Sequence, residues 1–184
     1  MRKILVVVDM QNDFVTGALG TPEAQAMLPA LLDYVEHFPG QIVFTLDTHG
    51  EDYLNSREGR QLPVVHCVKD TDGWKLVDPL QAFAQAHSCQ IFCKKTFGSA
   101  ELAQWLQTEH ETDPIGEILL AGVCTDICVI SNAMTIRSFL PEVPIGIVAI
   151  CCAGVTPQRH QTALDAMESC QMQILSSNDS GASL

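Results

Sequence analysis

The amino-acid sequence predicts an α/β fold in which helices cover both faces of a parallel β-sheet. Short apolar runs alternate along the chain with longer segments in which apolar residues recur at helical spacing. The apolar runs do not alternate with polar residues, which is typical of strands that are buried on both faces. The composition, 47% hydrophobic and 17% charged over 184 residues, fits one domain with a large core and argues against disorder.

Each element follows from one of these two patterns. Strands are expected at Ile4–Val8, Gln41–Leu46, Gln90–Cys93, Ile118–Ala121, Ile145–Ile150 and Gln171–Leu175. Helices are expected at Glu23–His37, Leu76–His87, Ser99–Gln107, Asp126–Phe139 and Pro157–Cys170. The last helix has the clearest start, because Thr156 is a good N-cap residue and Pro157 suits the first helical position.

The remaining segments are a long loop and a C-terminal tail. The stretch from Thr48 to Gly73 is rich in polar and charged residues, and we expect it to be irregular. A loop of this length in a compact domain is usually functional. Residues 176–184 are rich in Ser, Asn and Gly, and we expect this tail to be frayed. The sequence therefore predicts a single domain over residues 1–184 with a long insertion near 48–73.

The charge and the cysteine content exclude several classes of protein. The chain has 10 Lys and Arg against 22 Asp and Glu, a net charge of −12, and offers no basic stripe to nucleic acid. The N-terminal apolar run, Ile4–Val8, is too short for a signal peptide, and no stretch reaches the ~18 apolar residues of a membrane span. The eight cysteines include no C-x-x-C pair. We therefore expect a cytoplasmic protein whose cysteines are reduced and mostly buried.

Several side chains that can take part in chemistry follow the predicted strands, where ligands bind in open parallel sheets. Asp9 follows the first strand, and the residue alone is equally compatible with a turn or capping role and with a catalytic one. Lys94 and Lys95 follow the third strand, although a lysine at such a position is usually solvated.

Cys128 follows the fourth strand and is the candidate nucleophile. Gly122 ends that strand region and Asp126 can cap the next helix, which places Cys128 in the first helical turn. Free N–H groups and the helix dipole stabilise a thiolate there. A nearby carboxylate such as Asp9 can act as its base, with a lysine ammonium holding both anions. The alternative is a cysteine packed in the core, and this motif alone favours that alternative.

A metal site is the second candidate. Asp47 and His49 end the second strand, and their side chains point the same way in extended chain. Glu58 and His66 lie in the long loop that follows. Two histidines and two carboxylates suit a divalent transition-metal ion. The alternative is a set of surface or backbone-bonded histidines, since such residues are common in polar loops.

Together these residues resemble the isochorismatase-like cysteine hydrolases and, within them, the nicotinamidase branch. The resemblance extends from about Lys3 to Leu175. Four motifs carry it: Asp9-Met10-Gln11-Asn12-Asp13-Phe14; Asp47-Thr48-His49 with Glu58 and His66; Lys94-Lys95-Thr96-Phe97-Gly98-Ser99; and the nucleophile motif from Gly122 to Val129.

The resemblance implies a three-layer α/β/α sandwich around a mostly parallel, Rossmann-like sheet of about six strands. It also implies a triad in which Cys128 is the nucleophile, Asp9 the base and then the acid, and Lys94 the electrostatic partner, with Lys95 as the alternative lysine. In this family the peptide bond before the residue matching Cys124 is cis. The N–H groups of Cys124 and Cys128 are then expected to hold the oxyanion.

The implied activity is the hydrolysis of a small aromatic carboxamide to an acid and ammonia through a cysteine thioester. Asp47, His49, Glu58 and His66 would hold a divalent metal ion, with zinc expected first and manganese or iron as alternatives. Family members are often homo-oligomers.

The substrate ring would contact Phe14. The aromatic residue that precedes the last metal histidine in the family is replaced here by Leu62-Pro63-Val64-Val65. Trp74 can stack on the ring in its place, or else it anchors the start of a helix by packing.

Two other functions remain open from the sequence. The first is hydrolysis of another substrate of the same family, such as a carbamoyl compound or isochorismate. The second is a non-catalytic protein that binds a metal or a partner on this scaffold, although the intact triad argues against it.

Overall fold

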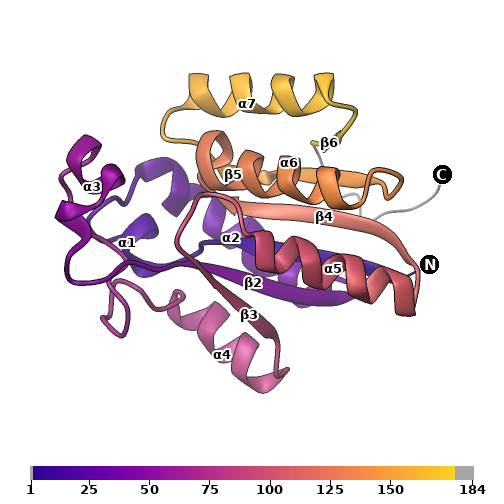
Figure 1. The fold of residues 1–184 in the computed structure, drawn as a ribbon, viewed down its shortest axis with the longest axis horizontal. Coiled ribbons are helices and arrows are strands. Elements are labelled where there is room, and N and C mark those ends of the chain that lie inside the picture. Colours follow the sequence, from indigo (N-terminus) through magenta and orange to yellow (C-terminus); the bar gives the residue numbers. More distant parts are fainter. Residues whose placement is uncertain (1, 177–184) are drawn as a thin grey trace.

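The computed structural model describes residues 2–176. Six parallel strands form one sheet in the order β3-β2-β1-β4-β5-β6 (Figure 1). Their bounds are β1 (Arg2–Val8), β2 (Gln41–Asp47), β3 (Gln90–Lys94), β4 (Ile115–Val123), β5 (Ile145–Ala153) and β6 (Gln173–Leu175). Residues 177–184 of the tail predicted to be frayed lie outside the described residues.

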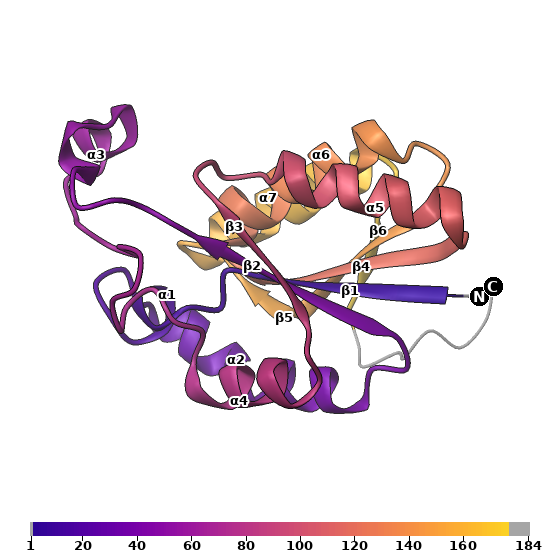
Figure 2. The same ribbon diagram turned by 60° about the horizontal axis from the view of Figure 1, so that its bottom comes forward.

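Helices cover both faces of the sheet, so the predicted three-layer α/β/α arrangement is confirmed (Figure 2). One face carries α2 (Pro22–His37) and α4 (Asp78–Ala86), and the other carries α5 (Ala100–Thr112), α6 (Ile130–Phe139) and α7 (Pro157–Ser169). The shorter helical segments are α1 (Asn12–Val15), η1 (Tyr53–Asn55), α3 (Arg57–Gln61) and the π-helical turn η2 (Thr125–Val129). Among the described residues, no helix combines the length and apolar character needed to cross a membrane.

The core explains why the strands read as unbroken apolar runs. All five residues from Ile4 to Val8 are fully buried, because β1 pairs with β2 on one side and with β4 on the other. Helices then cover both faces of the strand. The predicted cap of α7 is also confirmed, since the Thr156 side chain accepts a hydrogen bond from the N–H of Arg159.

All five predicted helices have somewhat different bounds in the structure, and two of these differences have a clear cause. The helix expected from Leu76 begins at Asp78 instead. Leu76 pairs with Gln11 in an isolated antiparallel bridge, so its apolar character reflects burial and not a helical face. The helix expected to end at Gln107 continues to Thr112. The prediction ended too early because the last turn is polar and partly exposed and shows no apolar period.

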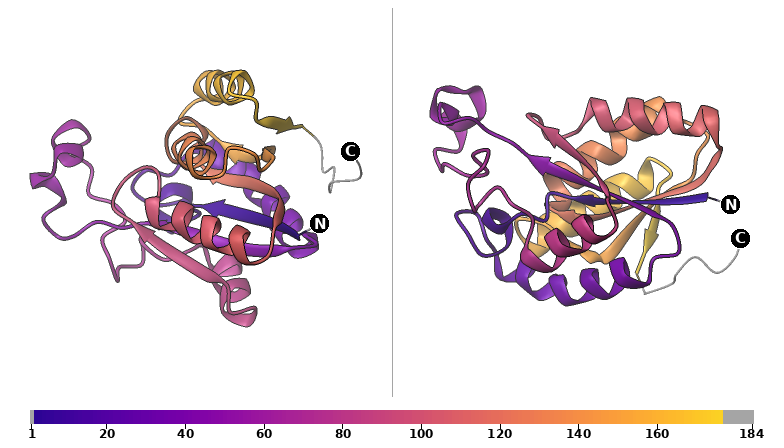
Figure 3. Two further views of the ribbon diagram at one scale, coloured as in Figure 1. Left: turned by 45° about the vertical axis from the view of Figure 1, so that its right-hand side comes forward. Right: turned by 90° about the horizontal axis from the view of Figure 1, so that it is seen from below.

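The loop at 48–73 is not wholly irregular, contrary to the prediction. It contains η1 and α3, and the Ser56 side chain caps α3 by accepting the N–H of Gly59 at 2.8 Å. Both segments are too short to produce a helical period in the sequence. Figure 3 shows α3 at the outer end of this loop, away from the sheet.

The strand order creates the position of the site. β2 and β3 lie on one side of β1, toward one edge of the sheet. β4, the next strand in the sequence, lies on the other side of β1. Crossover connections on opposite sides leave a crevice at the carboxyl ends of the two central strands. Val8 and Gly122 are paired at that end, so the residues that follow β1 and β4 lie side by side.

Candidate active site

An ion pair between Asp9 and Lys94 lies at the carboxyl end of the sheet. Asp9 follows β1 and Lys94 is the last residue of β3. Nζ of Lys94 lies 2.6 Å from Oδ2 of Asp9 and 3.6 Å from Oδ1 of Asp47. Both members of the pair are buried, whereas Lys95 is exposed. The geometry therefore selects Lys94 over Lys95 as the lysine beside Asp9.

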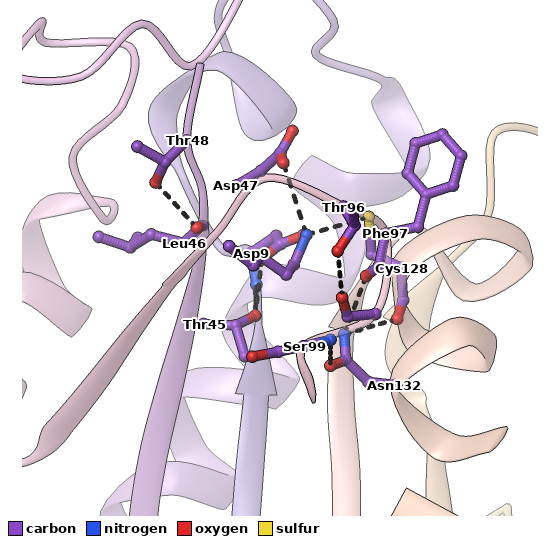
Figure 4. A network of polar contacts seen from close by, with 12 residues as sticks. Asp9, Thr45, Leu46, Asp47, Thr48, Thr96, Phe97, Ser99, Cys128 and Asn132 are labelled. Carbon is purple, nitrogen blue, oxygen red and sulfur yellow. Dashed lines mark hydrogen bonds and ion pairs between the residues drawn. The ribbon is translucent and has the colours of Figure 1, made fainter. Parts of the chain in front are cut away.

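The sulfur of Cys128 completes the cluster. Sγ of Cys128 lies 3.6 Å from Nζ of Lys94. Cys128 lies in η2, which follows β4, so the three groups come from the ends of three different strands (Figure 4). The structure thus brings together the three residues that the sequence proposed as a triad.

The nucleophile turn depends on a close approach between β1 and β4. Gly122 has φ +122°, and a Cβ atom there would lie 2.1 Å from the carbonyl oxygen of Val8. Only glycine fits at this position. The Val123–Cys124 peptide is cis, as expected.

Asp126 does not cap the helix as predicted. Cys124 is the residue before the η2 turn, and Oδ1 of Asp126 accepts the N–H of Val155 at 2.9 Å. Asp126 therefore ties the nucleophile turn to the end of β5, and Cys128 lies within a π-helical turn.

The electrostatics of the cluster indicate a protonated sulfur at rest. Burial raises the pKa of the Cys128 thiol, and the charge of Asp9 raises it further, whereas Lys94 lowers it. Burial also raises the pKa of Asp9, and Lys94 opposes that shift. The resting thiolate that the sequence predicted is therefore disfavoured, because burial and the charge of Asp9 raise the pKa of the thiol against the lowering effect of Lys94. The thiol must instead pass its proton to the neighbouring carboxylate.

Four side chains form a compact group beside this cluster: Asp47, His49, Glu58 and His66. One ligand atom from each lies within 4.8 Å of the others. Oδ2 of Asp47 is 3.0 Å from Nε2 of His49 and 3.7 Å from Nε2 of His66. Burial would raise the pKa of Asp47, but hydrogen bonds to the two histidines and the charge of Lys94 lower it below its usual range.

The chemistry of this group suits a divalent metal ion. Nδ1 of His66 lies 2.7 Å from the carbonyl oxygen of Val64. The proton of the neutral ring is then on Nδ1, which leaves the lone pair of Nε2 directed at the group. Two imidazoles and two carboxylates form a ligand set for a transition-metal ion or zinc.

A cavity of about 910 Å³ connects the two clusters. Cys124 and Cys128 line it, and so do the four residues of the metal group. Phe14 lines the cavity as expected from its motif.

Trp74 is not among the residues that line this cavity. Its indole Nε1 donates to the hydroxyl of Thr48 at 2.8 Å, which agrees with the packing role that the sequence left open. Phe97 lines the cavity and is 45% exposed, so it is a second aromatic wall that sequence reasoning used only to align the lysine motif.

Comparison with known proteins identifies the family to which this chain belongs. A domain model described as the isochorismatase domain matches residues 3–179. The chain belongs to the isochorismatase family. A relative from Bacillus subtilis, named as the uncharacterized isochorismatase family protein PncA, is 34% identical over 143 residues, which are 73% of this chain and 78% of the relative.

Solved structures of family members have the same fold. The nicotinamidase/pyrazinamidase PncA from Bacillus subtilis superposes with a TM-score of 0.81 at 27% identity, covering 95% of this chain and 99% of that chain. The pyrazinamidase of Pyrococcus horikoshii in complex with zinc gives a TM-score of 0.76 at 26% identity, covering 95% of this chain and 98% of that chain.

Sequence reasoning about this isochorismatase-family chain missed three buried polar residues that hold the site, and Gln11 and Thr45 are two of them. The Gln11 side chain pairs with the backbone of Asp47, donating to its carbonyl at 2.9 Å and accepting its N–H at 2.8 Å. The hydroxyl of Thr45 donates to Oδ1 of Asp9 at 2.6 Å. The sequence signal for Gln11 was its place inside the first motif. Thr45 gave no such signal, because it is a single polar residue in an apolar strand.

Asn132 is the third buried polar residue that was missed. Its Oδ1 accepts the N–H of Ser99 at 3.0 Å, and its Nδ2 donates to the carbonyls of Phe97 and Cys128 at 3.2 and 2.8 Å (Figure 4). It therefore joins the loop that carries Phe97 to the nucleophile turn. Its position four residues after Cys128, on the same helical face, was the only sequence signal.

Fewer cysteines are buried than the sequence analysis predicted. Cys67, Cys128, Cys151 and Cys152 are buried, but Cys93 and Cys170 are exposed and the remaining two are half-buried. All eight are free thiols.

Proposed function

We propose that this isochorismatase-family protein is a cysteine amidohydrolase of the nicotinamidase type. It would convert a small aromatic or heteroaromatic carboxamide to the acid and ammonia. The main support is the position of Nζ of Lys94, which lies 2.6 Å from Asp9 and 3.6 Å from the sulfur of Cys128 beside an open cavity. The likeness to solved nicotinamidases and pyrazinamidases supports the same reaction.

The proposed chemistry begins with a proton transfer. Asp9 takes the proton of the Cys128 thiol, and the sulfur attacks the carboxamide carbon. The N–H groups of Cys124 and Cys128 stabilise the oxyanion, and a donor of this kind is typically worth about 3–4 kcal/mol of transition-state stabilisation. Lys94 remains protonated throughout, because its charge neutralises whichever of the two partners is anionic.

Ammonia leaves when the tetrahedral intermediate collapses. The C–N bond breaks, and Asp9 delivers its proton to the departing nitrogen, which leaves an acyl thioester on Cys128. Asp9 then removes a proton from an attacking water molecule, and the C–S bond breaks. The acid is released and the thiol regains its proton.

The metal group would hold a divalent ion, for which we propose zinc first, with manganese or iron as alternatives. Asp47, His49, Glu58 and His66 would be its ligands, and the ion would supply a Lewis acid to the cavity. Phe14 and Phe97 would pack on the substrate ring. Gln11 would keep Asp47 in place through its two backbone hydrogen bonds.

We also propose that the chain acts as a single hydrolase domain, with the 48–73 segment as the insertion that carries part of the metal group. The single sheet of the described residues supports this. A carbamoyl or isochorismate-type substrate in the same cavity is the alternative reaction. The metal group beside the cavity favours nicotinamide over those substrates.

The test is an ammonia-release assay on nicotinamide, pyrazinamide, carbamoyl compounds and simple amides. We expect turnover of the two heteroaromatic carboxamides and its loss by at least about 10³-fold in Cys128→Ala. Cys170→Ala is the control, because Cys170 is exposed and lies at the end of α7. Circular dichroism checks that both variants fold. Retained turnover in Cys128→Ala would exclude the thioester mechanism.

A further inference from the structure

Three cationic side chains line the cavity where it is open to solvent, and we call this part of the cavity its mouth. Arg57 comes from α3, Lys95 from the loop after β3, and Arg159 from the first turn of α7. All three are exposed. Within residues 2–176, none of them makes a hydrogen bond or an ion pair with the protein. Their charges are therefore available to a ligand.

This concentration of positive charge is unusual for the chain that carries it. The protein has a net charge of −12 and only ten Lys and Arg. Three of these line the cavity, and Lys94 lies buried behind Cys128. Four of the other cations, Arg2, Lys3, Lys75 and Lys94, pair with carboxylates, as Lys75 does with Asp72 at 2.6 Å.

The acids at the cavity do not offset this charge. Asp47 and Glu58 are the only carboxylates among its lining residues, and both belong to the metal group. A divalent ion there would neutralise them. The cavity is then a positive site in an acidic protein, and such a site concentrates anions and steers them inward.

The size of the cavity allows a substrate larger than a single ring. Pockets of roughly 300–1,000 Å³ enclose drug-sized ligands, and this cavity measures about 910 Å³. Phe14 and Phe97 line the cavity together with Cys128 and can contact a ring bound there, which leaves the exposed cations available to a second group of the ligand. Arginine binds carboxylates through two parallel hydrogen bonds, so two of the three cations suit that group well.

We propose that the preferred substrates are carboxamides that carry a second, anionic group, a carboxylate held by Arg57, Lys95 and Arg159. The carboxamide lies at Cys128 and the carboxylate lies at the mouth. This inference rests on the proposed amidohydrolase function and narrows its substrate class.

Matched pairs of amides test it. Succinamate and succinamide, and 3-carbamoylbenzoate and isophthalamide, differ in whether the second group is a carboxylate or a neutral amide. The measurement is the ratio of kcat/KM for the anionic and the neutral member of each pair, from ammonia release at low and at high salt. We expect the anionic member to be favoured by about 10-fold or more at low salt, and less at high salt because exposed charges are screened.

Charge reversal assigns the effect to the mouth. Arg159→Glu and Arg57→Glu are expected to lower the ratio by about 10-fold each. Lys69→Glu makes the same charge change at an exposed lysine that does not line the cavity, and it should leave the ratio unchanged. A ratio near one in the wild type, or the same ratio in all three variants, would overturn the inference while nicotinamide turnover leaves the proposed function standing.

A binding measurement tests the anionic site independently of the proposed amidohydrolase chemistry. Calorimetry on the Cys128→Ala protein compares 3-carbamoylbenzoate with isophthalamide without any turnover. Tighter binding of the anion that is lost in the Arg159→Glu double variant supports the anionic site even if the chemistry differs from the proposal. Equal binding of both compounds counts against it.

Discussion

The hydroxyl of Thr45 donates a 2.6 Å hydrogen bond to Oδ1 of Asp9, from the middle of β2 to the residue that follows β1. Lys94 lies 2.6 Å from the other carboxylate oxygen. Both oxygens of this fully buried group are thus held by partners on β2 and β3. A carboxylate fixed in this way needs little reorientation to reach the sulfur of Cys128.

Replacement of Thr45 by valine should leave less of Asp9 in the ionised form that accepts the proton of the thiol. The hydrogen bond from Thr45 lowers the pKa of Asp9, so its loss raises that pKa further. A hydrogen bond to a charged group contributes about 1.5–3 kcal/mol, and we expect kcat/KM to fall by roughly 10- to 100-fold. Thr45→Ser keeps the hydroxyl and should restore most of the activity. Equal losses in Thr45→Val and Thr45→Ser would indicate a packing effect alone.

Removal of the buried ammonium should shift the pH profile. Burial raises the pKa of Asp9, and Lys94 is the group that lowers it most. Without Lys94 the carboxyl group keeps its proton to a higher pH, so the acid limb of kcat/KM in Lys94→Gln should move to higher pH as the rate falls. The exposed neighbour provides the comparison, since Lys95→Gln should not move that limb. A shift in Lys95→Gln instead would reassign the lysine.

Asn132 should be needed for both stability and the shape of the cavity. Asn132→Leu leaves the N–H of Ser99 and the carbonyls of Phe97 and Cys128 without their partner. A buried group left in this way costs about 1–3 kcal/mol. We expect a lower free energy of unfolding in urea and a higher KM for aromatic amides, because Phe97 is released. Ser138→Ala, an exposed change on the same helix, should have neither effect.

One divalent ion should bind to each chain through the metal group. Zinc binding, followed by competition with a chelating dye, should show one equivalent and should raise the melting temperature by linkage. His66→Ala should weaken binding by at least about 10²-fold. His37→Ala is the matched control, because His37 is exposed and pairs with Asp33 on α2. Unchanged zinc affinity in His66→Ala would remove this site.

The fold was predictable because buried parallel strands leave a direct record in the sequence. Ile4–Val8 is apolar at every position, as a strand covered on both faces must be. The predictions failed where a tertiary contact explains why a residue is apolar, or where a helix is too short to show a period. Leu76 is buried by a bridge to Gln11, and α3 is too short to show a period.

The candidate site was predictable where motif and strand end coincide, as at Asp9 and Cys128. Distances between such residues depend on strand order, which no local pattern records. The sequence did not reveal Thr45 or Asn132 as supports, because Asp9, the partner of Thr45, and Phe97 and Ser99, two of the three partners of Asn132, lie far away along the chain. It also placed a thiolate at Cys128, since the burial that raises the pKa of the thiol comes from the tertiary fold.

The pairing of β1 with β4 has a consequence for biosynthesis. β1 is synthesised first, whereas β4, one of its two neighbours in the sheet, is synthesised only after β2, β3 and the intervening helices. A nascent or truncated polypeptide that ends before residue 128 holds the acid and the ammonium but lacks the sulfur and the wall behind it. We therefore expect such a fragment to have no hydrolase activity, because the nucleophile is added only after β4.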